Sequence, residues 1–435
     1  AYGTGNDVTS LFAAADVNRY EGSGDNTVTY YSRSNWEGTV TPGAVKLAMT
    51  QQLFDDTVLT DSDLPSADGY EWPVFGKQAD LQLINMRGID ADDPQWETFM
   101  DQLTFDQLAK ICANGLRMTI AINEIGKPET LDHNGPSGVT QKYSVGSNGY
   151  AVQTNDPDKN MKGTCYPCNG IIAATMNSQL VEEVGELIGE DAMWAGYAGL
   201  YGTGLNIHRS PYSGRVFEYY SEDGFLSGKM AAQEVAAARS KGLVVYIKHF
   251  ALNDFETYRQ SVATFATEQA IREIYLKGFQ YAVEEGGANA AMTSFNRIGT
   301  RWAGAHSGLC NEVLRKEWGF VGVTLTDAVM ANRNWMDVSI GLEAGNDTWL
   351  SSGDWLVSKI EGWAAEDGKL LNNLRTSAKN FLYAYANSAA MNGMNETSHV
   401  VHTTSWVETD MLIARIVLIV LTALFGLAML VSCFM

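Results

Sequence analysis

The sequence predicts an α/β fold of the (β/α)8 TIM-barrel type, with an irregular N-terminal extension and a C-terminal transmembrane helix. From about residue 95 onward, short apolar runs alternate with helical patterns. This alternation is typical of right-handed βαβ units that build a parallel sheet. No G-x-G-x-x-G sequence follows a strand and no Walker sequence is present, so a nucleotide-binding sheet has no local support. The number of alternating units favours a barrel over an open sheet.

The individual elements follow from the spacing of their apolar residues. A helix is expected from residue 178, because one helical face would carry Leu180, Val181, Val184, Leu187 and Ile188. The same reasoning predicts strands at 204–207, 243–248, 289–294 and 321–326, and helices at 225–241, 267–285, 307–317 and 354–391.

The two ends of the chain differ from its middle. Residues 1–94 are rich in turn sequences, which predicts a connector that precedes a barrel domain at 95–394. A polar linker at 395–410 leads to a predicted transmembrane helix at 411–435. Residues 416–435 carry no charge and are long enough to span a bilayer. Their apolar side chains occur all around the helix, whereas a buried helix of a soluble protein is less uniformly apolar. We therefore expect a membrane-anchored protein.

The charge balance narrows the class of ligand. The chain has 51 acidic and 30 basic side chains, and its formal net charge is -21. Such a chain repels nucleic-acid phosphates and anionic membrane surfaces. We expect no nucleic-acid partner, and a neutral or polar small molecule fits better. The six His residues are scattered without metal-ligand spacing, so neither a metal nor another cofactor is expected.

The five Cys residues are too few for a disulfide scaffold in a chain of this length. Cys165 and Cys168 have the C-x-x-C spacing of thiol redox sites. A thioredoxin-type function would require that motif at the start of a helix in a small βαβ domain. The sequence around it differs, and redox chemistry stays as an alternative. Cys112 and Cys310 fall within helical patterns and are expected in the core.

Two predicted strands end in groups that can do chemistry. Lys248 and His249 follow the apolar run 242–247, and Asp327 follows the run 322–326. Catalytic groups of barrel enzymes lie at the carboxyl ends of the strands. Asp327 can serve as a nucleophile, a general base or a metal ligand, and nearby cations would favour its ionised form. It can equally serve as the N-cap of a helix.

A third segment of interest is residues 206–223 (NIHRSPYSGRVFEYYSED). It combines guanidinium groups, carboxylates and aromatic rings, which together can bind hydroxyl-rich rings by hydrogen bonds and stacking. Salt bridges that only fix a loop use the same residue types. The local pattern leaves both interpretations open.

Taken together, these segments resemble the barrel domain of family 3 glycoside hydrolases. The resemblance covers about residues 95–390. Several motifs in the family's order are far more specific than any one of them. The motifs are residues 102–109 (QLTFDQLA), 134–138 (NGPSG), 206–223, 248–253 (KHFALN), 272–276 (REIYL), 292–297 (MTSFNR), 314–320 (LRKEWGF) and 326–327 (TD).

The resemblance implies a retaining, β-glucosidase-like enzyme that cleaves sugars from the non-reducing end of small β-glycosides. In such an enzyme Asp327 would be the nucleophile and would form a covalent glycosyl-enzyme. The implied substrate-binding residues are Asn134, Arg215, Lys248, His249, Phe295 and Asp132.

A retaining mechanism also needs a second carboxyl group, about 5 Å from the first, that protonates the leaving group. In most of the family a separate α/β sandwich domain supplies it, and no such domain is recognised in this sequence. Residues 30–39 (YYSRSNWEGT) resemble the connector of members whose sandwich domain comes first, so we expect that missing domain upstream. Asp254 and Glu256 are candidate substitutes, although a carboxylate near Arg259 is more typical of a structural ion pair.

Two positions depart from the family pattern. Asn134 stands where the family usually has Asp before Gly-Pro, and Ala328 stands where many relatives have Trp after the nucleophile. An Asn side chain accepts a hydrogen bond without a charge, so its hydrogen bond to a sugar is weaker. The alternative function is therefore a catalytically degenerate sugar-binding barrel. Cleavage of extracellular glycans would require the barrel on the extracytoplasmic side of the membrane.

Overall fold

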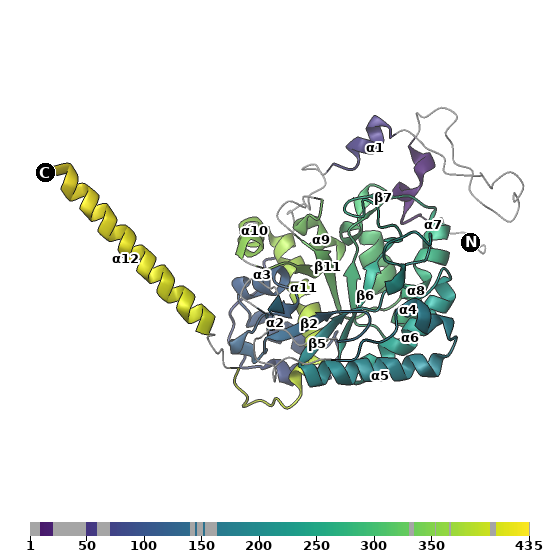
Figure 1. The fold of residues 1–435 in the computed structure, drawn as a ribbon, viewed down its shortest axis with the longest axis horizontal. Coiled ribbons are helices and arrows are strands. Elements are labelled where there is room, and N and C mark those ends of the chain that lie inside the picture. The colour runs from purple at the N-terminus through teal and green to yellow at the C-terminus, as the bar shows by residue number, and fades with distance from the viewer. Residues whose placement is uncertain are drawn as a thin grey trace, which may run out of the picture.

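The computed structural model describes residues 9–20, 49–58, 70–139, 144–145, 151–152, 163–329, 335–352, 354–364, 367–400 and 406–434. Its centre is a curled sheet of seven strands (Figure 1). In spatial order the strands are β1 (Met118–Thr119), β2 (Thr130–Asn134), β5 (Tyr197–Tyr201), β6 (Val244–Phe250), β8 (Ala290–Thr293), β11 (Val323–Ala328) and β12 (Thr348–Leu350).

Five of the six strand pairs are parallel, as the alternating sequence predicts, but β1 is antiparallel to β2. Only residues 120–129 join these two strands. A connection of this length is too short for the helical crossover that parallel neighbours need. The predicted strand at 204–207 is also wrong, because Gly204 forms only isolated bridges. The strand of this region is β5.

The two edges of the sheet approach each other. The Gly115 N–H donates to the Trp349 carbonyl at 2.9 Å, and the Leu116 N–H donates to the Ser351 carbonyl at 3.1 Å. The segment before β1 therefore lies beside β12. The described residues form a curled α/β sheet of seven strands, so the predicted eight-stranded barrel is supported only in its general architecture.

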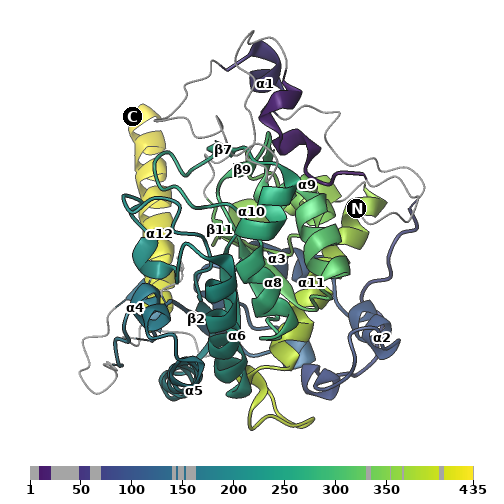
Figure 2. The ribbon, with the colours of Figure 1, turned by 90° about the vertical axis from the view of Figure 1, so that its right-hand side faces the viewer.

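Helices surround this sheet (Figures 1 and 2). The most extensive helix packing joins α5 to α6 and α6 to α8. In chain order the helices around the sheet are α2 (Gln95–Asp101), α3 (Phe105–Ala113), α4 (Asn169–Ala174), α5 (Ser178–Ala195), α6 (Gly224–Ser240), α7 (Glu268–Ala270), α8 (Lys277–Glu284), α9 (Val338–Ala344), α10 (Asp354–Ala364) and α11 (Gly368–Ala386).

The predicted helices are present with some changes of geometry. The helix expected at 225–241 is α6, and Gly242 after it has φ 87°, a left-handed conformation that favours glycine. The helix expected at 267–285 is interrupted by a π-helical turn at Ile271–Tyr275, and the next one is π-helical over Gly308–Glu317. The stretch 354–391 divides into α10, α11 and a short turn.

Helix α5 shows where the apolar pattern is ambiguous. Val181, Val184 and Ile188 are buried against the rest of the fold, as predicted. Leu180 and Leu187 are exposed instead. They belong to a second apolar stripe, which a count of apolar residues in one window does not separate from the first. Cys112 and Cys310 lie in the core, as expected.

The described residues of the predicted connector pack on the same body. The ring of Phe12 stacks on His306 with centroids 5.0 Å apart, and the Leu11 N–H donates to Glu268. Leu83 and Met86 are buried. The short helix α1 (Gln51–Asp55) also belongs to this region. The connector-like motif at 30–39 lies outside the described residues.

Small sheets and one long helix complete the described structure. A three-stranded sheet of β10 (Arg301–Trp302), β9 (Arg297–Ile298) and β7 (Ala263–Thr264) lies near the carboxyl ends of the central strands, and β3 (Ser144–Val145) pairs with β4 (Ala151–Val152). Helix α12 (Trp406–Phe434) extends away from the sheet (Figure 1). Its segment Thr409–Val431 is long and apolar enough to cross a membrane, judged by length and composition.

Candidate active site

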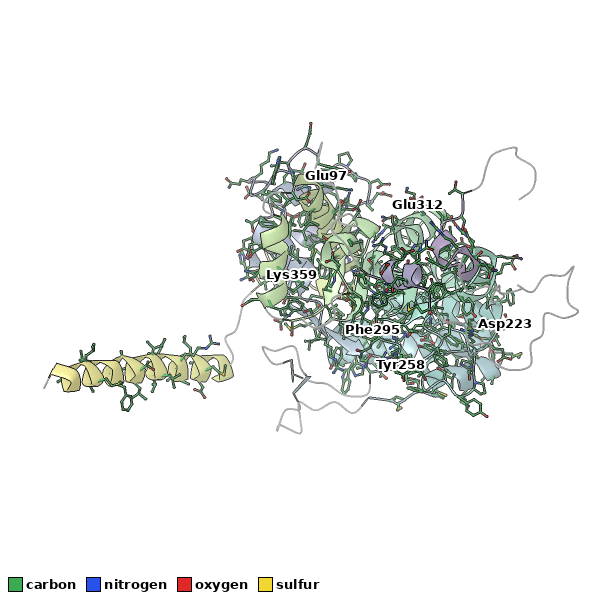
Figure 3. All side chains as sticks on the ribbon, turned by 90° about the horizontal axis from the view of Figure 1, so that it is seen from above. Glu97, Asp223, Tyr258, Phe295, Glu312 and Lys359 are labelled. Atoms are coloured by element: carbon green, nitrogen blue, oxygen red, sulfur yellow. The ribbon has the colours of Figure 1, made fainter. Side chains whose placement is uncertain are left out.

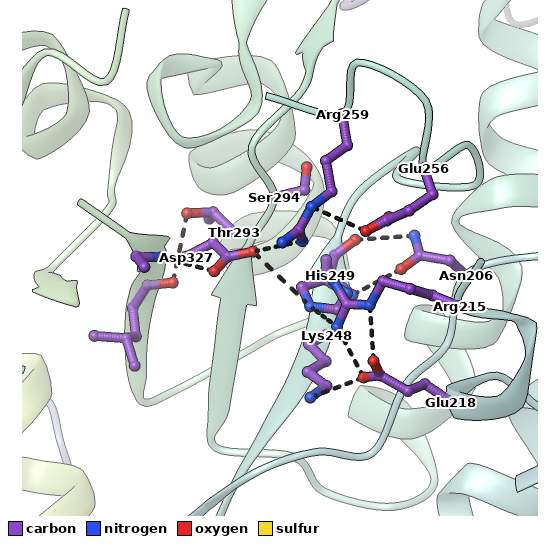
Figure 4. A network of polar contacts seen from close by, with 12 residues as sticks. Asn206, Arg215, Glu218, Lys248, His249, Glu256, Arg259, Thr293, Ser294 and Asp327 are labelled. Atoms are coloured by element: carbon purple, nitrogen blue, oxygen red, sulfur yellow. Dashed lines mark hydrogen bonds and ion pairs between the residues drawn. The ribbon is translucent and has the colours of Figure 1, made fainter. Parts of the chain in front are cut away.

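Asp327 lies at the carboxyl end of β11, and its side chain is 13% exposed. Its Oδ1 accepts the Ala328 N–H at 2.7 Å. Its Oδ2 faces His249 Nε2 and Arg259 Nη1, each 3.9 Å away (Figure 4). Ala328 still belongs to the strand, so Asp327 is not a helix N-cap. The carboxylate is therefore free to face the groups at the neighbouring strand ends.

Strand β6 brings Lys248 and His249 to the same edge of the sheet. Both side chains are only 2% exposed. Asn206 holds the strand end by two hydrogen bonds: its Nδ2 donates to the His249 carbonyl at 3.0 Å, and its Oδ1 accepts the His249 N–H at 2.9 Å. The amide side chain thus takes the place of a neighbouring strand and fixes the backbone where the two site residues begin.

Glu218 joins the cations of two different segments. Arg215 donates from Nε to Oε1 at 2.7 Å and from Nη2 to Oε2 at 2.8 Å, which is a bidentate pair. Lys248 Nζ lies 3.1 Å from Oε2 of the same carboxylate. Burial acts to raise the pKa of Glu218, but Lys248 and Arg215 outweigh it and hold the pKa below its usual range. Glu218 is therefore the ionised counter-charge of this site.

The contacts of His249 identify its tautomer. Arg215 Nη2 lies 2.9 Å from His249 Nε2. Because a guanidinium group can only donate, Nε2 accepts, and the ring proton resides on Nδ1. Nδ1 in turn contacts the Tyr219 hydroxyl at 3.2 Å. Burial and the positive charges of Arg215 and Lys248 lower the pKa of His249 well below its ordinary value. The ring is neutral at neutral pH, so its contact with Asp327 is not an ion pair.

Opposing influences act on the protonation of Asp327. Burial raises its pKa, while the Ala328 N–H and the positive charges of Arg215 and Arg259 act in the opposite direction. Burial is the larger influence, so the pKa lies above the ordinary value for Asp. The surrounding cations nevertheless favour the carboxylate form that a nucleophile requires.

Two further predicted substrate-binding residues, Asn134 and Phe295, lie near the residues that surround Asp327. Asn134 is exposed at the end of β2. Lys248 Nζ donates to the carbonyl of the next residue, Gly135, at 3.2 Å. The Lys248 side chain therefore reaches across β5 to the end of β2. Phe295 is buried, and the Arg259 guanidinium lies over its ring, 4.9 Å from the centroid.

Asp132 lies apart from these residues, two positions before Asn134 on β2. It is 2% exposed. Tyr385 donates its hydroxyl to both carboxylate oxygens at 3.2 Å, and the Tyr201 hydroxyl lies 3.4 Å from Oδ2. Burial raises the pKa of Asp132 to about 7, despite these hydroxyls and the charge of Lys127. The structure thus places Asp132 in an interior network of hydroxyl groups.

Arg259 and Glu218 were not among the predicted site residues, although both contact the group around Asp327. Arg259 Nε pairs with Glu256 Oε1 at 2.9 Å, the ion pair that the sequence suggests. Both pairs have a three-residue spacing on loops, Arg215 with Glu218 and Glu256 with Arg259. This three-residue spacing between opposite charges was visible in the sequence and could have pointed to Glu218 and Arg259. We refer to Asp327, Arg215, Glu218, Lys248, His249 and Arg259 as the Asp327 cluster.

The C-x-x-C motif lies at the start of the six-residue helix α4. Cys168 is the residue before the helix, Cys165 is exposed, and both thiols are free. The motif stands beside the α/β sheet that carries the Asp327 cluster, not in a small separate βαβ domain. Within the described residues no group of three or more His, Cys, Asp and Glu side chains could hold a metal ion.

Comparisons with known proteins agree on one family. Residues 157–373 match the model of the glycosyl hydrolase family 3 N-terminal domain. Beta-glucosidase A of Butyrivibrio fibrisolvens is 36% identical over 264 residues, which are 59% of this chain and 30% of that protein. An exo-alpha-(1->6)-L-arabinopyranosidase of Bifidobacterium longum is 34% identical over 226 residues, 52% of this chain and 29% of that protein.

A solved structure shows the same fold. Beta-glucosidase 3B from Thermotoga neapolitana, in complex with alpha-D-glucose, aligns with a TM-score of 0.61 and 29% sequence identity. The alignment covers 68% of this chain and 43% of that chain. The chain thus spans less than half the length of these relatives. The matched domain contains Asp327, Arg215, Lys248 and His249, and through it the chain belongs to glycosyl hydrolase family 3.

Proposed function

We propose that this chain provides the nucleophile and the sugar-binding groups of a retaining β-glucosidase-like hydrolase. The observation that carries the proposal is the position of Asp327, whose Oδ2 faces His249 and Arg259 at 3.9 Å. The partly buried Arg215 and the buried Glu218 and Lys248 lie beside it. Glycosidases of this class need an ionised carboxylate beside groups that bind sugar hydroxyls. The β-glucosidases among the relatives support glucose as the first sugar to test.

In the proposed mechanism Asp327 attacks the anomeric carbon of the terminal sugar. A bond forms from its oxygen to that carbon, while the bond to the leaving-group oxygen breaks and that oxygen takes a proton from a general acid. Lys248, His249 and Arg215 bind the sugar hydroxyls, and Asn134 contributes a neutral acceptor at the end of β2. Water then attacks the anomeric carbon from the face opposite Asp327 and gives a proton to the deprotonated general acid, while the bond from the sugar to Asp327 breaks. This step releases the sugar and restores both carboxyl groups.

The general acid is proposed to come from outside the residues of this chain. The relatives extend well beyond the matched region, which leaves room for a further domain. Glu256 is the competing candidate, and burial raises its pKa, as an acid would require. However, its Oε1 is engaged with Arg259 at 2.9 Å, which favours a role as the ion-pair partner of that residue. Asp254 is buried and accepts the Ile207 N–H, so it has no open path to a leaving group.

We further propose that α12 anchors the protein in a membrane with the sheet on the extracytoplasmic side. The supporting observation is the apolar segment Thr409–Val431, whose side chains are all exposed. A helix of this length can cross the hydrocarbon layer. The predicted division into a connector at 1–94, a barrel at 95–394, a linker at 395–410 and the anchor at 411–435 is retained as part of this proposal.

The nucleophile can be tested without the general acid. 2,4-Dinitrophenyl 2-deoxy-2-fluoro-β-D-glucopyranoside has a leaving group that departs unprotonated, so labelling requires only Asp327 and the sugar-binding groups. We expect a fluoroglucosyl adduct that peptide mapping by mass spectrometry locates on Asp327. The Asp327→Asn variant is the control and should stay unlabelled. An adduct on another carboxylate, or none while the sugar still binds, would contradict the proposal.

The alternative is a sugar-binding barrel without turnover, which the neutral Asn134 favours. It predicts that the complete protein binds glucose or a thioglucoside but neither accepts the fluorosugar label nor releases 4-nitrophenol from aryl glycosides. 4-Nitrophenyl α-L-arabinopyranoside should be included beside the β-glucoside, because one relative is an arabinopyranosidase. Turnover of either substrate excludes the binding-only alternative.

A further inference from the structure

Helix α11 has two faces of different chemistry. One face is buried in the core and includes Leu374, Phe381 and Tyr385. The other face is polar and repeats every three or four residues, at Asn372, Thr376, Asn380, Tyr383 and Asn387. A polar outer face is ordinary for a helix that covers a core, so its composition alone indicates only contact with solvent. The surroundings of this face are less ordinary.

Two adjacent cavities follow the polar face of α11. Its first three residues line a cavity of about 550 Å³, and its last two residues line a cavity of about 390 Å³. Phe320 and Val321 line both cavities, so the cavities meet at these residues. We refer to the two cavities together as the α11 groove. From Asn372 to Asn387 the helix axis measures about 22 Å. Cavities of several hundred Å³ are large enough for a small ligand.

The α11 groove lies at the opposite end of the central strands from Asp327. Val321 and Asp347, which line the groove, come directly before β11 and β12, whereas Asp327 lies near the carboxyl end of β11. Figure 3 labels Glu97, which lines the larger cavity, well apart from Phe295, the ring beneath Arg259. The groove is therefore separate from the Asp327 cluster.

The charges in the groove are balanced within the protein. Each cation that lines the larger cavity in the described part of the chain has a carboxylate partner. Arg315 Nη2 lies 2.6 Å from Asp347 Oδ2. Arg375 Nη2 and Lys379 Nζ lie 3.1 Å and 3.6 Å from oxygens of Glu97. A bound anion would have to displace these carboxylates, so the groove favours a neutral ligand.

Side-chain amides supply the hydrogen-bonding groups of the larger cavity. Asn380 donates from Nδ2 to Asp347 Oδ1 at 2.9 Å, and Asn372 donates from Nδ2 to the Gly368 carbonyl at 2.7 Å. These bonds hold the amides in place, and neither amide oxygen accepts a hydrogen bond from another described residue. Asn373 lines the same cavity, and its buried Nδ2 has no hydrogen-bond partner among the described residues. The wall thus offers uncharged groups of fixed position that the protein does not saturate.

We propose that the α11 groove binds a neutral, hydroxyl-rich oligosaccharide, as a second sugar-binding site separate from Asp327. A sugar hydroxyl both donates and accepts hydrogen bonds, so it matches uncharged amides better than an ion does. The length of the groove suits an elongated ligand. The groove takes no part in the chemical step, and this binding does not depend on Asp327 acting as a nucleophile.

The test isolates the groove from the Asp327 cluster in the complete protein. The parent protein carries Asp327→Asn, so that a sugar is not consumed, and Asn134→Trp, which fills the exposed end of β2 beside that cluster. We expect calorimetric titration of this parent with cellotetraose or laminaritetraose to show one bound molecule. Thr376→Trp places the same bulky ring at an exposed position in the larger cavity and should abolish this binding.

A milder variant and a control accompany the filled groove. Asn372→Ala removes one amide from the wall and should weaken tetrasaccharide binding by about three- to tenfold, the loss of one hydrogen bond. Gln179→Trp is the matched control, because it adds the same ring at an exposed position on α5, away from the groove. It should bind the tetrasaccharide as the parent does.

Three results would overturn the proposal. The parent could bind neither tetrasaccharide, or Thr376→Trp and Asn372→Ala could both bind as tightly as the parent. Thr376→Trp could also lower the melting temperature of the complete protein while the parent binds no sugar, which would mean that another part of the protein fills the groove. Failure of the proposed function is recognised separately, by 4-nitrophenyl β-D-glucopyranoside. Thr376→Trp alone should hydrolyse it as the wild type does, and a wild type without turnover leaves the binding test unchanged.

Discussion

Asp327 and Asp132 are two carboxylates on strands of the same sheet, and burial raises the pKa of both. They differ in their position along the strand. Asp327 is one residue from the end of β11 and 13% exposed, whereas Asp132 is two residues from the end of β2 and 2% exposed. The two positions differ by one residue, which is about 3.3 Å along a strand. This small difference in depth separates a group that a ligand can reach from one that is enclosed.

Their neighbours differ as well. Asp327 faces the nitrogen groups of His249 and Arg259, and the charges of Arg259 and Arg215 favour its ionised form. Asp132 receives hydroxyl groups from Tyr201 and Tyr385, which act to lower its pKa but are outweighed by burial. The first environment suits a reacting carboxylate. The second suits a structural group whose charge is costly.

The largest expected effect separates the two carboxylates directly. Asp327→Asn keeps the shape of the side chain but removes the nucleophile, so kcat/KM should fall by about 10⁴-fold or more while the melting temperature changes little. Asp132→Asn is the matched substitution in the interior and should stay within about fivefold of wild-type activity. Steady-state kinetics and thermal unfolding of both variants test this. Comparable losses of activity would mean that Asp132 belongs to the sugar site.

Glu218→Gln tests whether the Asp327 cluster depends on its internal counter-charge. The substitution leaves Arg215 and the buried Lys248 without their shared carboxylate. Removing one partner of a buried ion pair typically costs about 3 kcal/mol, and the displaced cations should lower kcat/KM by about 10²-fold. Denaturant unfolding and kinetics measure the two effects.

Glu285→Gln is the control for that substitution. Glu285 pairs with Lys229 on the surface, where both side chains are about 40% exposed. Exposed pairs of this kind contribute little to stability. If Glu218→Gln behaves like Glu285→Gln, the counter-charge is not needed and the contrast between the two environments is weaker than proposed.

The sequence predicts the strand ends of this site better than its loops. Lys248, His249 and Asp327 each follow an apolar run directly, so their place at the edge of a parallel sheet can be derived from the pattern. The contacts of Glu218 and Arg259 depend on loops that meet only in the folded protein. Their three-residue spacing from an opposite charge was visible, but surface loops show the same spacing.

The depth of Asp132 and the geometry of β1 were harder to foresee for different reasons. Asp132 lies two residues inside the end of β2. A short apolar pattern does not locate the end of a strand to within two residues, so the burial of Asp132 could not be predicted. The antiparallel β1 could have been inferred, because residues 120–129 leave no room for a crossover helix. Helix α5 shows the limit of periodicity, since Leu180 and Leu187 fit the helical pattern and yet face solvent.

The pH dependence of catalysis offers a smaller effect with a definite sign. The positive charge of Arg259 lowers the pKa of Asp327. Arg259→Gln should therefore raise that pKa further, and the acidic limb of kcat/KM should move to higher pH by about half a unit to one unit. 2,4-Dinitrophenyl β-D-glucopyranoside is the suitable substrate, because its leaving group needs no general acid.

Glu256→Gln is the control with the opposite sign. Glu256 interacts unfavourably with the charge of Asp327. Its neutralisation should move the acidic limb to lower pH, while the ion pair with Arg259 is lost in both variants. Shifts in the same direction would show that the loop rearranges, and the electrostatic account of Asp327 would then be wrong.

The smallest effect on activity concerns the interior carboxylate, whose contribution appears only in stability. The pKa of Asp132 is raised to about 7, so its protonated form is favoured in the folded state. The contribution of Asp132 to the free energy of unfolding is fully present below the ordinary pKa of Asp and is lost as the pH rises toward 7. Asp132→Asn should therefore gain stability relative to the wild type as the pH rises from about 4 to about 7, by about 1.4 kcal/mol for each pH unit. Denaturant unfolding across this range measures the difference in unfolding free energy between the two proteins. Groups that titrate in the same way in both proteins cancel from this difference.

Lys127 remains coupled to Asp132, and its pKa is lowered to about 7 by burial. A difference that is constant with pH would place an ionised Asp132 in the folded protein, and the two carboxylates would then differ in access alone.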